Sequence, residues 1–422
     1  MKILQIFKFW ARKSFIKNFF SLTIFQAIEL FIPLLTIPII IDRVGAEMFG
    51  LISFALVFCI FFQLIINFGF NTISVREVAI YSDNQKVLSN VFNDTVNSKL
   101  ILSLFCFIPF CVIIFSIEKF SATPDIYLYT FISLLSQSLI PVWFFQGLQM
   151  SKYLTISSFV GKSIYLILIL LFLKKESDYI LVPIFNFIGY IITAGITIYV
   201  ALIKYKITYH FITWNKFVKQ LKMGKYMFLS EIKLYFISYF NIFLLGIISG
   251  NIAVAYFSGA EKILRAISNL FMPIQNSLFP ILAVKLNSER EKAILLIKKI
   301  ILYSGLFFLI FCTVLYVFSD WIVTIILGEN MKESVIVFKI LIFIPLLSFF
   351  DTLFGKQILL NLKKEKEFFR VVLCIALINF PLISFFTLKF SYIGTSISQV
   401  ITQVLLALGM LYYSHTSLKQ KS

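Results

Sequence analysis

Apolar stretches of about 20 residues, separated by short polar segments, recur along the whole chain. A helix needs about 20 apolar residues to cross the hydrocarbon core of a bilayer. The pattern therefore predicts an all-α polytopic membrane protein of about twelve transmembrane helices, near residues 18–41, 49–69, 98–117, 126–147, 156–173, 179–203, 226–248, 252–280, 299–318, 335–359, 368–388 and 391–414.

The longest interval between predicted spans lies midway along the chain. We expect an N-terminal six-helix bundle at 1–205 with a basic cytoplasmic N-terminus, a basic cytoplasmic linker at 206–225, and a C-terminal six-helix bundle at 226–422. The sequence Lys17-Asn-Phe-Phe-Ser enters the first span much as Lys225-Tyr-Met-Phe-Leu-Ser enters the seventh. Since six helices is an even number, the halves should be parallel repeats related by a pseudo-two-fold axis along the membrane normal.

Composition and charge support this interpretation. Hydrophobic residues make up 60% of the 422 residues and charged residues only 14%, whereas soluble domains average about a quarter. The lysine and arginine residues that give the net charge of +18 lie mostly in alternate loops. One of these is the segment that carries Arg76, Lys86 and Lys99. This asymmetry is typical of the positive-inside rule rather than of nucleic-acid binding, and it predicts that both termini are cytoplasmic. The five cysteines and two histidines form no metal or catalytic spacing, so no cofactor is expected.

One predicted span carries charge at its centre. Glu261, Lys262 and Arg265 lie there, although an ionised side chain at mid-bilayer costs about 2.5 to 3.5 kcal/mol. At helical spacing they share a polar stripe with Ser258, Ser268, Asn269, Met272 and Asn276. We therefore expect this stripe to face a protein interior or a water-filled cavity.

The spacing within this group predicts its chemistry. Glu261 and Arg265 are four residues apart with the acid first, the favourable order for an ion pair within a helix. Lys262 is then left without a partner, and Lys233 in the seventh span adds a further cation. The C-terminal half is thus expected to present a positive cavity wall suited to an anionic ligand such as a diphosphate.

Other ionisable residues also lie inside predicted spans. Glu29 and Asp351 are candidates for coupling to protons or sodium, with a structural ion pair as an equal alternative. Lys162 lies close to the cytoplasmic end of its span, which favours a side chain that snorkels to the interface.

Prolines and one aromatic run mark a further set of positions. The prolines remove helical hydrogen bonds and are expected to bend their spans; they are Pro33, Pro38, Pro141, Pro273, Pro280, Pro345 and Pro381. Trp143, Phe144 and Phe145 follow one of them, and their position favours an interfacial aromatic belt or, alternatively, contact with sugar rings.

Three stretches resemble a known family. They are Pro33-Leu-Leu-Thr-Ile-Pro38 followed by Arg43-Val-Gly and Glu47-Met-Phe-Gly50, then Pro141-Val-Trp-Phe-Phe-Gln-Gly147, and Tyr256-Phe-Ser-Gly-Ala-Glu-Lys262 with Arg265. They are similar to the polysaccharide transporters that flip lipid-linked O-antigen and capsule repeat units. That family belongs to the superfamily that also contains the multidrug and toxic-compound extrusion proteins.

The resemblance implies two six-helix bundles around a cationic lumen in a bacterial inner membrane. The implied substrate is an undecaprenyl-diphosphate-linked oligosaccharide, flipped to the outer leaflet by alternating access without enzymatic chemistry. Arg265, Lys262, Glu261 and Lys233 are then the candidate substrate-binding residues, with membrane lipid and polysaccharide assembly proteins as candidate partners.

Two other functions stay open. A membrane polysaccharide polymerase or ligase should have a sizeable outer loop with arginine or acidic residues, whereas the predicted outer loops are short. A multidrug exporter of the same superfamily should favour an acidic cavity.

Overall fold

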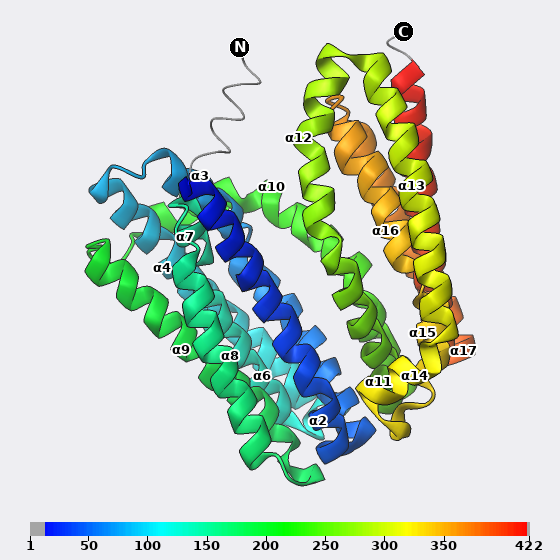
Figure 1. Cartoon of the computed structure of the whole chain (residues 1–422). Helices are drawn as coiled ribbons and strands as arrows, with labels where there is room; N and C mark the ends of the chain where they lie inside the picture. The colour runs from blue at the N-terminus through cyan, green and yellow to red at the C-terminus, as the bar shows by residue number, and fades with distance from the viewer. Residues whose placement is uncertain (1–12, 420–422) are drawn as a thin grey trace. The chain divides into compact units, whose positions relative to one another are not determined.

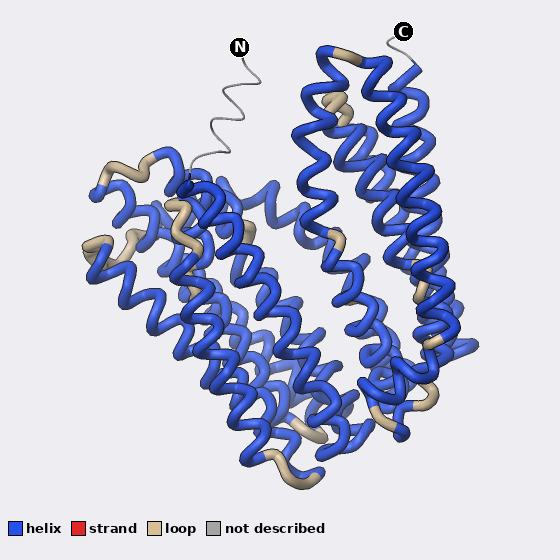
Figure 2. Tube along the Cα trace, in the orientation of Figure 1, coloured by secondary structure: helices blue, strands red, loops and turns tan. Residues whose placement is uncertain are grey.

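The computed structural model describes residues 13–419. The side chains of 13–19, 233, 234, 237, 238, 273, 274, 276, 277 and 287 lie outside the description, as does the first part of the predicted basic N-terminal segment. Within the described range every regular element is a helix (Figures 1 and 2), which confirms the all-α prediction.

The helices of the described chain follow one another along the sequence with short connections. They are α2 (Lys13–Asn67), α3 (Phe70–Ile80), α4 (Gln85–Ser116), α5 (Glu118–Ser121), α6 (Pro124–Leu139), α7 (Val142–Gly147), α8 (Lys152–Phe172), η1 (Glu176–Ile180), α9 (Leu181–Lys204), α10 (Trp214–Ser238), α11 (Phe240–Leu270), α12 (Met272–Ser288), α13 (Arg290–Val317), α14 (Ser319–Leu327), η2 (Glu329–Met331), α15 (Ser334–Leu341), α16 (Ile344–Thr352), η3 (Leu353–Leu360) and α17 (Glu365–Lys419).

Their length and apolar character make this a multi-pass membrane protein. Nine segments of the described chain are long and apolar enough to cross a membrane. Two of them, Phe20–Ile80 and Glu365–Lys419, contain 61 and 55 residues, so each is long enough for two spans. The helix α10 is not among the nine, and its first half carries Lys216, Lys219, Lys222 and Lys225.

Two glycines break long helices with nearly the same backbone conformation. Gly45 in α2 has φ 79° and ψ 168°, and Gly250 in α11 has φ 82° and ψ −175°. Only glycine adopts such a positive φ without steric cost, so each glycine allows a sharp turn between two helical segments. A serine follows eight residues later in both cases, at Ser53 and Ser258. This shared geometry is what parallel repeats of one ancestral bundle would produce.

The chain forms two compact units, which are described separately. Unit 1 holds the described residues up to Val44 together with Ala55–Tyr235, and unit 2 holds Gly45–Phe54 and the described residues from Phe236 onward. Inside unit 1 the start of the predicted linker lies against α4, because Asn93 donates a 2.8 Å hydrogen bond to the carbonyl of Thr208. Residues 214–225 are helical. The predicted limits of the two bundles stay predictions.

The aromatic run of α7 belongs to the core of unit 1, so the prediction of an interfacial belt or a sugar contact is wrong. Trp143, Phe144 and Phe145 are each at most 1% exposed. Phe144 meets the ring of Phe92 edge to face at a centroid distance of 5.5 Å. Pro141 precedes α7 and ends α6 early, and this interruption directs the following aromatic side chains inward.

The prolines divide into two groups. Pro273 and Pro345 lie in the first turns of α12 and α16, where a missing N–H is tolerated, so they mark places where one helix ends and another begins. Other prolines lie inside helical segments: Pro33 and Pro38 in α2, Pro280 in α12 and Pro381 in α17.

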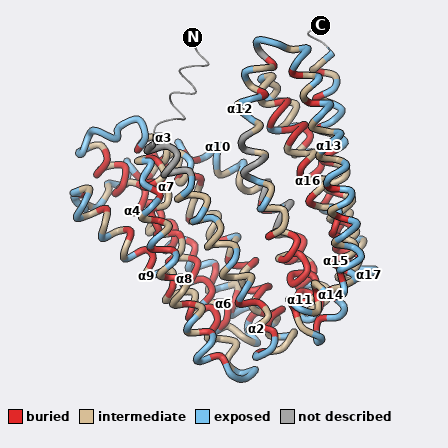
Figure 3. Tube along the Cα trace, in the orientation of Figure 1, coloured by how far each residue is buried: buried red, intermediate tan, exposed pale blue. Residues whose placement is uncertain are grey.

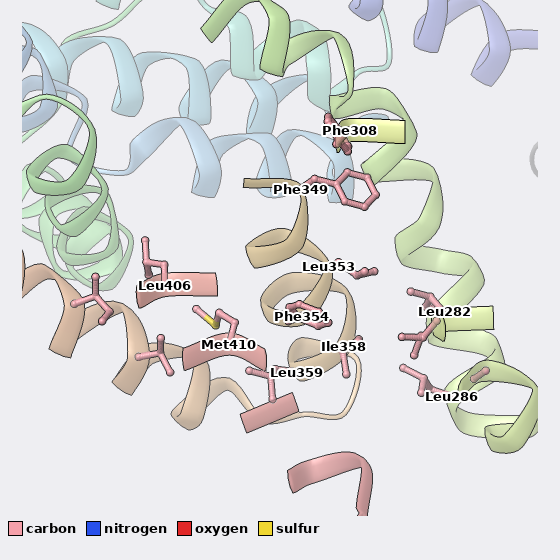
Figure 4. Close-up of a cluster of buried hydrophobic side chains, with 14 residues drawn as sticks. Leu282, Leu286, Phe308, Phe349, Leu353, Phe354, Ile358, Leu359, Leu406 and Met410 are labelled. Carbon is pink, nitrogen blue, oxygen red and sulfur yellow. The ribbon is translucent and has the colours of Figure 1, made fainter. Parts of the chain in front are cut away.

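Unit 2 has a separate apolar core around η3, which is a π-helix. Figure 4 shows Phe354 and Ile358 of η3 among the side chains of Leu282 from α12, Phe308 from α13 and Met410 from α17. This core packs α12, α13, η3 and α17 together.

Candidate functional site

The charged group at the centre of α11 contains the predicted ion pair. Arg265 Nε donates to Glu261 Oε1 at 3.0 Å, and Arg265 Nη2 donates to the same oxygen. Arg265 Nη1 also donates to the hydroxyl of Tyr239 at 3.2 Å. These bonds use three of the five guanidinium N–H donors, while the Arg265 side chain stays 35% exposed. The arginine is therefore held in place and can still present donors to a ligand.

The pair borders a cavity of about 360 Å³ within unit 2. Parts of α11, α15, α16 and α17 surround it. Figure 3 shows that α11 is largely buried at its labelled end. Amides and hydroxyls dominate the lining, which consists of Asn241, Glu261, Leu264, Arg265, Ser268, Asn269, Leu341, Ile344, Ser348, Gln399, Thr402 and Gln403. Such a surface offers many donors and acceptors to a hydroxyl-rich or anionic ligand.

A hydrogen-bond network fixes the wall of this cavity. Thr402 Oγ1 donates to Asn379 Oδ1 at 2.7 Å, and Asn379 Nδ2 donates to Asn241 Oδ1 at 3.3 Å. Gln403 donates to one carboxylate oxygen of Asp351, and Thr352 donates to the other at 3.1 Å. Since buried polar groups with satisfied partners hold one geometry, the lining is pre-organised.

Lys262 points to another part of unit 2 and is not among the residues that line this cavity. Its ammonium donates to Ser53 Oγ at 3.1 Å and lies 4.5 Å from the centre of the Phe49 ring. Lys262 therefore does not line this cavity together with Glu261 and Arg265, and its substrate-binding role stays a prediction. Adjacent helical positions differ by about 100°, so the residue after Glu261 faces a different neighbour.

The described lining carries one cation, Arg265, and one anion, Glu261, so a net positive cavity wall stays a prediction. Lys233 is predicted to add a positive charge to the cavity wall, and its side chain lies outside the described residues.

Unit 1 contains a second intramembrane ion pair, in different surroundings. Lys162 Nζ lies 3.6 Å from Glu29 Oε2 and donates to the hydroxyl of Tyr190 at 3.2 Å. Ser158 donates to the other oxygen of the Glu29 carboxylate. Lys162 is 5% exposed, so the prediction that it snorkels is wrong. The structural alternative for Glu29 is present, whereas a coupling role for Glu29 or Asp351 stays a prediction.

Lys99 is a buried residue of α4 rather than a loop lysine, which corrects its placement in a cytoplasmic segment. It is 2% exposed, and its ammonium donates to Asn71 Oδ1 and to the carbonyl of Ser138, both at 2.8 Å. The helix α4 begins at Gln85, well before the predicted span, because polar residues can be helical when they pack against neighbouring helices.

No cluster of histidine, cysteine or acidic residues that could hold a metal occurs among the residues that the structure describes. His210 Nδ1 lies 3.0 Å from Asn93 Nδ2.

Sequence reasoning missed the polar residues that complete the cavity. Gln399, Thr402 and Gln403 lie on one face of α17 and recur at helical spacing, so their pattern was visible in the last predicted span. They are uncharged, and a search for intramembrane charge passes over them. Tyr239 lay outside the predicted stripe because it belongs to the turn before α11.

The helical fold with polar sites inside its spans is similar to the folds of solved membrane proteins. A multidrug resistance MATE family transporter of the MOP superfamily, in an inward-facing conformation, has a TM-score of 0.72 at 15% identity over 96% of this chain and 99% of that one. The lipid II flippase MurJ, in an inward closed conformation, has a TM-score of 0.66 at 17% identity over 94% and 87%. These similarities concern the fold.

The sequence comparison is more specific. The family model described as polysaccharide biosynthesis protein matches residues 15–286, and the chain belongs to this family. A protein of Escherichia coli strain K12 described as "Putative O-antigen transporter" is 26% identical, covering 94% of this chain and 96% of that protein. A protein of Shigella dysenteriae with the same description is 25% identical, covering 94% and 98%.

Proposed function

We propose that the protein is a flippase for a lipid-linked oligosaccharide. The substrate is an undecaprenyl-diphosphate-linked repeat unit of the O-antigen or capsule type, and it moves from the cytoplasmic to the outer leaflet by alternating access. The relatives described as O-antigen transporters and the family match support this substrate class. In this proposal the protein lies in the bacterial inner membrane with both termini in the cytoplasm.

The observation that carries the proposal is the cavity of unit 2 with Arg265 on its wall. A guanidinium donates in a planar fork that matches a phosphate, and its weak hydration lowers the cost of removing it from water. Glu261 and Tyr239 fix the orientation of Arg265 without using all of its donors. The amides and hydroxyls beside it fit the sugar part of the same ligand.

Glu261 has a second effect in this proposal. Its carboxylate partly neutralises Arg265, which keeps the diphosphate from binding so tightly that release becomes slow. Lys262 and Lys233 complete the candidate substrate-binding set and meet the diphosphate elsewhere on its route. The prenyl tail stays in the bilayer, so only the polar head needs to be sheltered.

The test is export of the surface glycan by cells whose only copy of the protein carries a substitution. Arg265→Glu should abolish export because the cavity then carries two carboxylates that repel a diphosphate. Arg265→Lys should retain part of it, since the charge remains and the fork is lost. Normal glycan from the Glu variant, at a normal protein level in the membrane, would contradict the proposal.

The cavity also bears on the alternative of a drug exporter. Such a protein should place an uncompensated acidic residue or aromatic rings against its ligand, whereas the described lining pairs its one carboxylate with Arg265 and contains no aromatic side chain. We therefore favour the flippase over the drug exporter.

A further inference from the structure

Unit 2 contains a second cavity that shares no lining residue with the first. It has a volume of about 280 Å³ and lies between α13, η3 and the last turns of α17. Its floor is apolar and includes Ile297 and Ile301 of α13, Phe354 and Ile358 of η3, and Leu411 and Leu418 of α17. Figure 4 shows Phe354 and Ile358 within the core of this region, so the floor of this groove is part of a packed scaffold.

The rim of this groove is cationic. Lys298, His415 and Lys419 line it together with the apolar residues. Lys298 and His415 are exposed, and in the described chain neither has an acidic partner within ion-pair distance. Arg290 holds the end of α17 in place by donating to the carbonyl of Ser417 at 3.3 Å and to that of Leu418. Basic side chains of α13 and α17 thus lie together along this rim.

An apolar floor with a cationic rim fits an amphiphile that has a hydrocarbon chain and an anionic head. The outer side of α13 carries exposed Leu295, Leu302 and Leu306, as expected for a helix that contacts acyl chains. Basic pockets between transmembrane helices at the membrane surface bind the head groups of acidic lipids. A free phosphate would leave the apolar floor unused.

We propose that this groove binds an anionic phospholipid of the surrounding bilayer. One acyl chain lies along Ile297, Ile301 and Ile358, and the phosphate lies at Lys298 and His415. Such a lipid would join α13 to the end of α17. This inference stands apart from the transport proposal, because none of its residues belongs to the cavity of Arg265.

Native mass spectrometry of the full-length protein, exchanged into detergent with defined lipids, tests it. The protein should retain phosphatidylglycerol or cardiolipin in preference to phosphatidylcholine. Lys298→Gln should weaken this retention about fivefold, because a basic residue near an acidic head group contributes about that factor. Ile301→Trp should also weaken it while leaving every charge in place, since the indole fills the path of the acyl chain.

Lys299→Gln is the matched control, because Lys299 is the exposed neighbour of Lys298 and does not line the groove. It should leave retention unchanged. Equal retention of phosphatidylcholine, or equal losses from Lys298→Gln and Lys299→Gln, would overturn the proposal. Displacement of the phospholipid by equimolar undecaprenyl diphosphate would overturn it as well, in favour of the transported lipid as occupant.

Discussion

The two intramembrane ion pairs differ in what surrounds them. In unit 1, Lys162 and Glu29 lie among Ser158 and Tyr190, and the space beside Lys162 has no room for a water molecule. In unit 2, Glu261 and Arg265 border a cavity of about 360 Å³. A pair of one acid and one base therefore joins neighbouring helices in unit 1, whereas in unit 2 it lies on the wall of a cavity, where we propose that it meets a ligand. The surroundings of each ion pair, rather than its charge, therefore distinguish a structural role from a proposed ligand-binding role.

Neutralising each pair as a whole should give the largest contrast. Glu261→Gln with Arg265→Met should lower transport about 100-fold, because a ligand loses charge-assisted hydrogen bonds worth about 3 kcal/mol in total. Glu29→Gln with Lys162→Met should leave transport close to normal, since replacing both partners of a buried pair is often neutral for folding. Surface glycan and membrane protein level are measured for both.

Normal transport by the unit 2 double variant, together with loss of transport by the unit 1 double variant, would contradict this comparison. Loss of transport in the folded Glu29→Gln, Lys162→Met protein would show that this pair takes part in the transport cycle, as expected for ion coupling.

A single substitution in unit 1 should produce the next largest effect, on stability. Lys162→Met leaves the Glu29 carboxylate without its cation and should lower the free energy of unfolding by about 2 to 3 kcal/mol, below the full value for a buried pair because Glu29 is 31% exposed. Thermal unfolding in detergent measures the change. Adding Glu29→Gln should recover most of it, and a double variant as unstable as the single one would show that packing, rather than charge, sets the cost.

The wall of the unit 2 cavity should give a smaller effect. Asn379→Ala removes hydrogen bonds to Asn241 and Thr402 and leaves the buried Asn241 Oδ1 without this donor, whereas Thr402 can still donate to the Ser398 carbonyl, so it should cost about 1 to 2 kcal/mol. Ser384→Ala on the same helix serves as the control, because that hydroxyl bonds only within its own helix turn to the Phe380 carbonyl. Equal unfolding midpoints for the two variants would mean that the network does not hold the wall.

The smallest effect belongs to Asp320, an exposed carboxyl in the segment between two candidate spans. Lys339 donates to Asp320 at 2.7 Å and thereby lowers the pKa of that carboxyl below its usual value. A lowered pKa stabilises the fold above the unfolded pKa near 4, and this contribution is lost as the pH falls through the lower, folded value. Asp320→Asn should change stability by less than about 1 kcal/mol at pH 7, since Asp320 is 70% exposed.

Below pH 4, the free energy of unfolding should be the same for the unsubstituted protein and for Asp320→Asn. A difference that persists there would assign the effect to something other than this charge.

Much of the fold was predictable because the bilayer imposes a long apolar period on the sequence. The Glu261 and Arg265 pair followed from spacing within one helix, which fixes the geometry before any tertiary contact forms. The direction of Lys262 and the burial of Lys99 were not predictable, because both depend on side chains from other helices, Ser53 in one case and Asn71 in the other. Contacts between helices carry no signal in a single sequence.

The aromatic run after Pro141 shows the same limit. Its composition fits a lipid interface, a sugar site or a core equally well, and only the break between α6 and α7 decides for the core.

The central claim is that the unit 2 cavity carries the diphosphate head of a lipid-linked oligosaccharide. The most direct test reconstitutes the purified protein into liposomes with a defined undecaprenyl-diphosphate oligosaccharide and follows its leaflet with a probe that cannot cross the bilayer. The account predicts rapid exposure of the glycan by the normal protein and none above protein-free liposomes by Arg265→Glu. Equal rates for the two proteins would contradict it.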